Sequence, residues 1–77
     1  MKLTKLQGQY VAFIFYYTKL NGRPPAERAL EYYFRTTPPA VHDMILRLEK
    51  CGAIRREPWT ARSLRVLVPP DEIPRLD

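Results

Sequence analysis

The hydrophobic positions of the chain change from a helical period to an alternating one near residue 53. Before that point, three stretches carry apolar residues at the spacing of an amphipathic helix. After it, two short stretches alternate between apolar and polar residues, as half-buried strands do. The pattern predicts three helices followed by a β-hairpin.

The first helix is predicted from about residue 5 to Leu20. Thr4-Lys5-Leu6-Gln7 has the form of a capping box, in which Thr4 and Gln7 satisfy backbone N–H groups reciprocally. Asn21-Gly22 ends the helix, because both residues tolerate a left-handed backbone. Gly8 weakens the first turn by up to ~1 kcal/mol relative to alanine. The residues expected on the buried face are Leu6, Tyr10, Phe13, Ile14 and Tyr17.

Prolines precede each of the two helices that follow. Pro24-Pro25 holds an extended connector, and a short helix is predicted over residues 26–34, with an apolar stripe of Ala29, Leu30, Tyr33 and Phe34. Thr37 then caps a third helix with Pro38 at its first position, where the missing N–H costs nothing. This helix runs to about Cys51, and its buried positions are Val41, Met44, Ile45 and Leu48.

The C-terminal third is predicted to form a hairpin with strands over residues 54–57 and 64–68, joined by a loop over 58–63. Two short helices joined by a tight turn and followed by a basic hairpin are typical of a winged helix-turn-helix. The predicted class is therefore mainly α with a small β-hairpin, in one domain over residues 1–68. An irregular tail over residues 69–77 completes the chain.

Composition narrows the chemistry. The 77 residues allow one small domain, and a net charge of +5, from 13 Lys+Arg against 8 Asp+Glu, favours partners that carry phosphates. Cys51 is the single cysteine, so no intrachain disulfide forms, and with the single His42 it is too few for a metal site. No cofactor is expected, because no Gly-rich phosphate loop or nucleophile–base pair occurs, and the chain is not expected to be an enzyme. Without a signal peptide or an apolar run of ~18 residues, we expect a cytoplasmic protein that no membrane anchors.

Several short motifs, in matching order and spacing over about residues 3–67, resemble the N-terminal domain of the LexA repressor family. They are Leu3-Thr4-x-x-Gln7, Asn21-Gly22-Arg23-Pro24-Pro25, Thr37-Pro38-x-Ala40-Val41-His42, Leu48-Glu49-Lys50-x-Gly52-x-Ile54, Arg55-Arg56-Glu57-Pro58 and Arg62-x-Leu64-Arg65-x-Leu67. The resemblance implies a third helix that enters the major groove of DNA and a hairpin wing that lies along the backbone or minor groove.

Carried over by position, the resemblance places Thr37, Pro39, Ala40, His42 and Asp43 on the recognition helix and Arg62 on the wing. Arg47 and Lys50 lie off the apolar stripe of the third helix and are further candidates for phosphate contact. The turn over residues 34–37 lacks the family's glycine and is one residue short, and Pro39 replaces a small polar residue. The family's self-cleaving protease domain has no counterpart in these residues, so no Ser/Lys catalysis is expected.

Two features leave alternatives open. Trp59 in the wing loop either stacks on a sugar, wedges into a groove or folds back over the sheet. Val11, Phe15 and Tyr16 fall off the apolar stripe of the first helix, so either the tail, with Ile73 and Leu76, or a second copy of the chain covers them.

The predicted function is sequence-specific binding of double-stranded DNA by a transcriptional regulator, in the manner of a repressor. The alternative is a winged helix that docks a protein partner through the aromatic first helix. Operator, effector and oligomeric state do not follow from the sequence.

Overall fold

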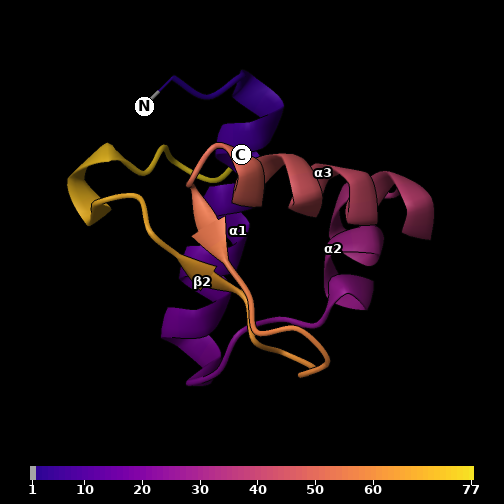
Figure 1. Ribbon diagram of the computed structural model, residues 1–77. Helices are drawn as coiled ribbons and strands as arrows, with labels where there is room; N and C mark the ends of the chain where they lie inside the picture. The colour runs from indigo at the N-terminus through magenta and orange to yellow at the C-terminus, as the bar shows by residue number, and fades with distance from the viewer. Residues whose placement is uncertain (1) are drawn as a thin grey trace.

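The computed structural model describes residues 2–77. Three helices are followed by an antiparallel hairpin, in the order α1 (Lys5–Asn21), α2 (Glu27–Phe34), α3 (Pro38–Lys50), β1 (Ile54–Arg55) and β2 (Arg65–Val66), with a short 3-10 turn over Pro70–Glu72 (Figure 1). The predicted class, a mainly α winged helix-turn-helix, is confirmed. No helix among residues 2–77 is both long and apolar enough to cross a membrane.

The ends of α1 are set by local signals that the sequence displays. Thr4 Oγ1 accepts a hydrogen bond from the Gln7 N–H at 3.1 Å, and Gln7 Oε1 accepts one from the Thr4 N–H at 2.9 Å. This is the predicted capping box. Gly22 ends the helix with φ 75°, a left-handed conformation that glycine adopts without steric cost.

The turn between α2 and α3 closes without a glycine. Arg35 takes the left-handed position itself, with φ 51° and ψ 53°, and the Thr36 N–H donates back to the Glu31 carbonyl at 3.1 Å. Thr37 then caps α3 by accepting the Ala40 N–H at 3.3 Å. The motif therefore keeps its tight turn, at the steric cost of placing a side chain in the left-handed region.

The core lies between the inner faces of α1 and α3, with Leu30 of α2 and the hairpin closing it. Its buried members are Tyr10, Val11, Ile14, Leu30, Val41, Ile45, Leu48, Ala53, Ile54, Leu64 and Val68. The predicted stripe of α3 is confirmed, with Met44 partly buried against the core. The inner face of α2 is shared by Leu30 and the partly buried Phe34.

The predicted face of α1 is wrong at two positions. Val11, expected outside the stripe, is fully buried, whereas Leu6, expected inside it, is 52% exposed. The buried stripe is rotated toward Val11, which joins the buried cluster formed with residues of α3 and the hairpin, and α1 packs closely against β2. Val11 consequently has no surface with which to contact a second copy of the chain.

Aromatic side chains join α1 to α2. The ring of Tyr10 stacks on that of Phe34 with centroids 4.2 Å apart, and Phe13 packs on Tyr33 at 4.6 Å. Such pairs stabilise beyond the area they bury. Burial of Tyr10 raises the pKa of its hydroxyl above 10.0, because desolvation disfavours the phenolate.

The hairpin is shorter than predicted. Ile54 pairs with Val66 and Arg55 with Arg65, and the inward positions Leu64 and Val68 are buried as the alternation requires. Beyond Arg55 the backbone ladder is replaced by side-chain bonds, in which Ser63 Oγ accepts the Glu57 N–H at 3.0 Å. The strands therefore stop at two residues each.

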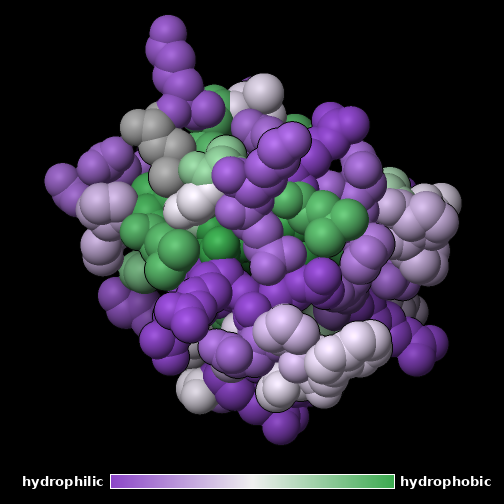
Figure 2. Space-filling model, viewed as in Figure 1, coloured by the Kyte–Doolittle hydropathy of each residue, from purple (hydrophilic) through white to green (hydrophobic). Residues whose placement is uncertain are grey.

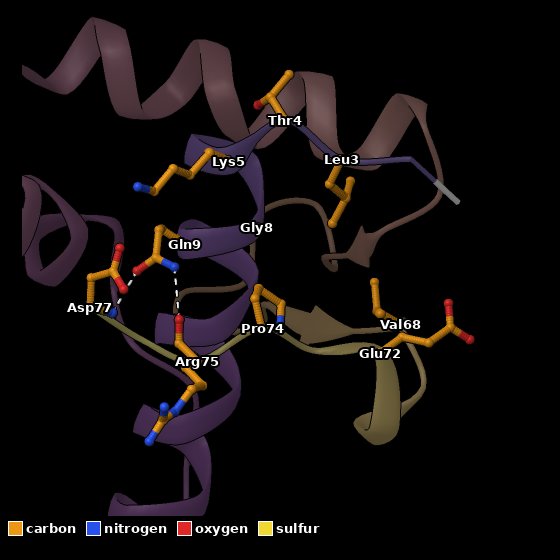
Figure 3. A pocket seen from close by; sticks show the side chains of 10 residues that line it. All are labelled: Leu3, Thr4, Lys5, Gly8, Gln9, Val68, Glu72, Pro74, Arg75 and Asp77. Atoms are coloured by element: carbon orange, nitrogen blue, oxygen red, sulfur yellow. Dashed lines mark hydrogen bonds between the residues drawn. The ribbon is translucent and has the colours of Figure 1, made fainter.

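Residues 69–77 pack against the start of α1. The Gln9 amide donates to the Arg75 carbonyl and accepts the Asp77 N–H, both at 2.8 Å (Figure 3). Pro74 lies over Gly8, where a Cβ would come within 3.1 Å of the proline Cγ. Gly8 thus costs the helix some propensity and leaves room for the tail.

Candidate nucleic-acid interface

The outward face of α3 carries the predicted recognition residues. All of those that the sequence singled out are exposed to solvent, namely Thr37, Pro39, Ala40, His42, Asp43, Arg47 and Lys50, and Arg62 on the wing is exposed as well. Val41, Ile45 and Leu48 hold the opposite side of the helix in the core with no exposed area. The helix therefore presents one polar face with a rigid backing.

The charges on this face are partly paired. Arg47 Nε lies 3.0 Å from Asp43 Oδ2 one helical turn earlier, and both side chains are more than 60% exposed. An exposed pair of this kind contributes about 0.3–0.5 kcal/mol, so it yields readily to a stronger partner. Asp43 thus holds the Arg47 guanidinium along the helix without locking it there.

Glu27 at the start of α2 links α3 to the wing. Its Oε1 lies 3.8 Å from His42 Nδ1, and its Oε2 lies 3.8 Å from Arg56 Nη1. Arg56 Nε also donates to Glu49 Oε1 at 2.9 Å. The first residue after β1 is therefore tied to both helices of the helix-turn-helix, to the start of α2 through Glu27 and to the C-terminal part of α3 through Glu49.

The contacts with Glu27 and Glu49 distinguish Arg56 from the other arginines of the hairpin. Arg56 is about 30% exposed and has two carboxylate partners, so its contribution is to hold the wing in place. Arg55 and Arg65 face one another across the hairpin, and both are exposed. Like charges directly opposite one another destabilise a sheet, and only Glu57, 3.8 Å from Arg55, offsets this pair.

Arg62 lies between two grooves of the wing. One, of about 340 Å³, separates the wing loop from the start of α2, where it is lined by Ala26 and Glu27. The other, of about 380 Å³, is lined by Arg55, Arg62 and Arg65. Arg62 has φ 53°, a left-handed backbone that turns the loop back toward β2.

The structure excludes one interpretation of Trp59. Its side chain is fully exposed and does not fold back over the sheet. The reason is local, because Trp59 follows Pro58 in a turn whose backbone, with φ 65° at Trp59, directs the indole away from the hairpin. Stacking on a sugar and wedging into a groove remain as the alternatives.

Sequence reasoning missed the contacts of Glu27 with His42 and Arg56, which join residues far apart in the chain. The available signal was the pair Arg55-Arg56, one of which had to lie inward on an alternating strand. Among residues 2–77, no group of three or more His, Cys, Asp or Glu side chains gathers closely enough to hold a metal ion.

Known proteins similar in sequence to this chain include LexA repressors. The LexA repressor of Thermosipho africanus is 35% identical over 72 residues, which are 94% of this chain and 36% of the relative. Those of Shouchella clausii and Thermotoga petrophila are 39% and 38% identical over 67 and 64 residues. The chain is related to the LexA repressors. No established protein-family profile matches it.

The relationship to LexA covers one part of those proteins. The chain spans about a third of the length of the relatives it matches. Within that third, the LexA-like motifs lie on the elements described above, from the capping box of α1 to the wing at Arg62. The turn after α2, which contains no glycine, is closed by Arg35 in the left-handed conformation.

Proposed function

We propose that this chain is a module that binds double-stranded DNA with sequence specificity, as part of a transcriptional regulator with repressor character. The observation that carries the proposal is the contact of Arg56 with Glu27 of α2 and Glu49 of α3, which holds a wing rich in arginine beside the helix-turn-helix. In this arrangement the helix can enter one groove of DNA while the basic hairpin contacts the phosphates beside that groove.

In this proposal the residues divide into two groups. Thr37, Pro39, Ala40, His42 and Asp43, at the N-terminal end of α3, meet base edges in the major groove, where a recognition helix makes its specific contacts. Arg47, Lys50 and Arg62 meet phosphates, which position the module without reading sequence. Arg47 leaves or shares Asp43 when it does so, since that exposed pair is weak.

Phosphate contacts make the affinity depend on salt. Each contact releases condensed counterions, so log K falls with log salt by about 0.9 per phosphate. Three contacts per chain, from Arg47, Lys50 and Arg62, give a slope of about −3.

The test is a duplex titration at several salt concentrations. The probes are a duplex selected from a random library by the wild-type protein and a scrambled duplex of equal length. Arg62→Ala is expected to weaken both complexes and to flatten the slope by about one unit. His42→Ala is expected to change the ratio between the two duplexes more than the slope, because base contacts carry specificity.

A matched control comes from α2. Arg28→Ala removes an exposed charge from the middle helix without touching the proposed face, and it should leave the ratio between duplexes unchanged. A wild-type protein that binds no duplex at low salt refutes the proposal. Binding with a slope near zero refutes the assignment of phosphate contacts.

We also propose that two copies act together on neighbouring half-sites. A single module of this size buries a small area on DNA, and dimers of such modules read two sites about one helical turn apart. With Val11 inside the core, the contact between copies is assigned to Phe15 and Tyr16. Their rings meet edge to face at 5.2 Å on the half-buried side of α1.

The alternative function, docking of a protein partner through the aromatic first helix, has less support. Tyr10 and Phe13 are engaged with rings of α2, and Lys19 lies 5.6 Å over the ring of Phe15. Most of the aromatic rings that suggested this alternative therefore already have contacts within the chain.

A further inference from the structure

The tip of the wing exposes the single tryptophan of the chain. The exposed fraction of Trp59 is 103%, the highest among the exposed large apolar side chains of residues 2–77. Tryptophan buries a large apolar area when it finds a partner, and proteins rarely leave one wholly in water. The backbone is also strained at this residue, since φ is 65° at Trp59.

The loop that carries Trp59 is braced from within. Ser63 Oγ accepts the Glu57 N–H at 3.0 Å and lies 2.9 Å from the Thr60 carbonyl oxygen, to which it donates. The Thr60 N–H donates to the Glu57 carbonyl at 3.2 Å. These bonds close the loop on both sides of the tryptophan. The indole is therefore carried on a turn with a defined backbone and needs little further ordering to bind.

Positive charge flanks the indole and points to the chemistry of its partner. Residues 58–63 contain Arg62 and no acid. Arg62 shares a groove with Arg55 and Arg65, in which Glu57 is the one acidic side chain. Trp59 itself lines the neighbouring groove, together with Arg56 and Arg62 and the carboxylates of Glu27 and Glu57. A protruding aromatic ring with Arg62 beside it fits a surface where an apolar slot runs between rows of phosphates. The minor groove of duplex DNA, about 6 Å wide, has this character.

Contacts at the root of the wing fix its position relative to α3. Arg56, at the root of the wing, is bonded to Glu49 of α3 and lies 3.8 Å from Glu27, which in turn approaches His42. Figure 1 shows the loop as an orange segment at the bottom of the view, below α2 and away from α3. The root of the wing is therefore fixed relative to α3, and the loop extends away from it.

We propose that Trp59 is a wedge that the wing presses into the minor groove next to the major-groove site of α3. The inference rests on the proposed function. The indole packs against deoxyribose and the edge of a base step and partly unstacks it, as apolar side chains do in minor-groove binders. Flexible pyrimidine–purine steps open at the least cost, so Trp59 favours them without any hydrogen bond to a base.

The experiment uses the intrinsic fluorescence of Trp59, which no other indole in the chain obscures. Binding is followed independently by the anisotropy of a labelled duplex, selected by the wild-type protein from a random library. With the duplex saturating, Trp59 emission is expected to be quenched or shifted to the blue. Collisional quenching by acrylamide is expected to fall several-fold.

Variants of Trp59 test whether the indole contributes to DNA binding. Trp59→Ala is expected to weaken the selected complex roughly tenfold, the scale of losing one aromatic stack on nucleic acid, while the salt slope stays unchanged. Trp59→Phe should recover part of this loss. The matched control is Leu20→Ala, which removes an apolar side chain that is 84% exposed at the far end of α1 and should leave affinity unchanged. Since Trp59 is fully exposed, its variants should unfold at the wild-type temperature.

Deformation of the DNA is the second readout. Energy transfer between dyes at the two ends of the selected duplex should increase on binding wild-type protein and increase less with Trp59→Ala. Tight binding with unchanged Trp59 fluorescence, or equal affinity of Trp59→Ala and wild type, overturns the wedge and leaves the proposed function standing. Absence of duplex binding by the wild type overturns both.

Discussion

Ile45 is the residue of α3 at which a substitution tests most directly whether the recognition helix is backed by the core. Its side chain has no exposed area. Ile45→Ala removes three carbon groups at about 0.8 kcal/mol each, or about 2.4 kcal/mol. The cavity that remains raises the expected cost to about 3–4 kcal/mol. Domains of this length have a free energy of unfolding of about 4–12 kcal/mol, so the loss is a large share of the total.

The assay is urea unfolding followed by far-ultraviolet circular dichroism, with Leu46→Ala as the matched control. Leu46 is the next residue along the same helix and is 43% exposed, so its truncation should cost less than about 1 kcal/mol. The midpoint is expected to fall strongly for Ile45→Ala, at an unchanged dependence on urea. Thermal unfolding should show the same order, at roughly 4–8 °C per kcal/mol.

Two results would refute the reasoning. Equal destabilisation by Ile45→Ala and Leu46→Ala would mean that the assigned face of α3 is wrong. A cost for Ile45→Ala below about 1 kcal/mol would mean that the site collapses around the smaller residue and lacks the tight packing assumed here.

Two further predictions concern the turn and the assembly. Arg35→Gly should raise the free energy of unfolding by about 0.5–1 kcal/mol, because relief of the left-handed strain exceeds the added entropy of glycine in the unfolded chain. Arg28→Gly, within α2, is the control and should lower the free energy of unfolding by about 1 kcal/mol. Calorimetry measures both variants. Phe15→Glu should convert any dimer detected by sedimentation into monomers, because the carboxylate would be buried unpaired; a wild type that stays monomeric on a two-site duplex refutes the assignment.

Local signals in the sequence determined where the elements begin and end. The capping box at Thr4, the stop at Gly22 and the Thr37-Pro38 start of α3 act through bonds between residues a few positions apart. The inward stripe of α3 was equally readable, since a long, regular period leaves one choice of face. The exposure of the candidate recognition residues followed from that stripe alone.

The tertiary structure decided what depends on neighbours distant in the chain. Whether Val11 or Leu6 is buried depends on which side of α1 its neighbours in the fold cover, and periodicity does not encode that side. Gly8 seemed only a weak helix former until Pro74 was found above it. Burial is a property of surfaces brought together, so a single element cannot specify it.

The same distinction holds in the candidate site. Which hairpin arginine is paired within the chain was decided by Glu27 and Glu49, two carboxylates on different helices that both approach Arg56. The position of Trp59 depended on a strained turn closed by Ser63, which placed the indole in water where hydrophobicity alone favoured packing. The sequence by itself determined the elements and the polar face of α3, and only the assembled fold determined which charges and rings that face and the wing leave available to a partner.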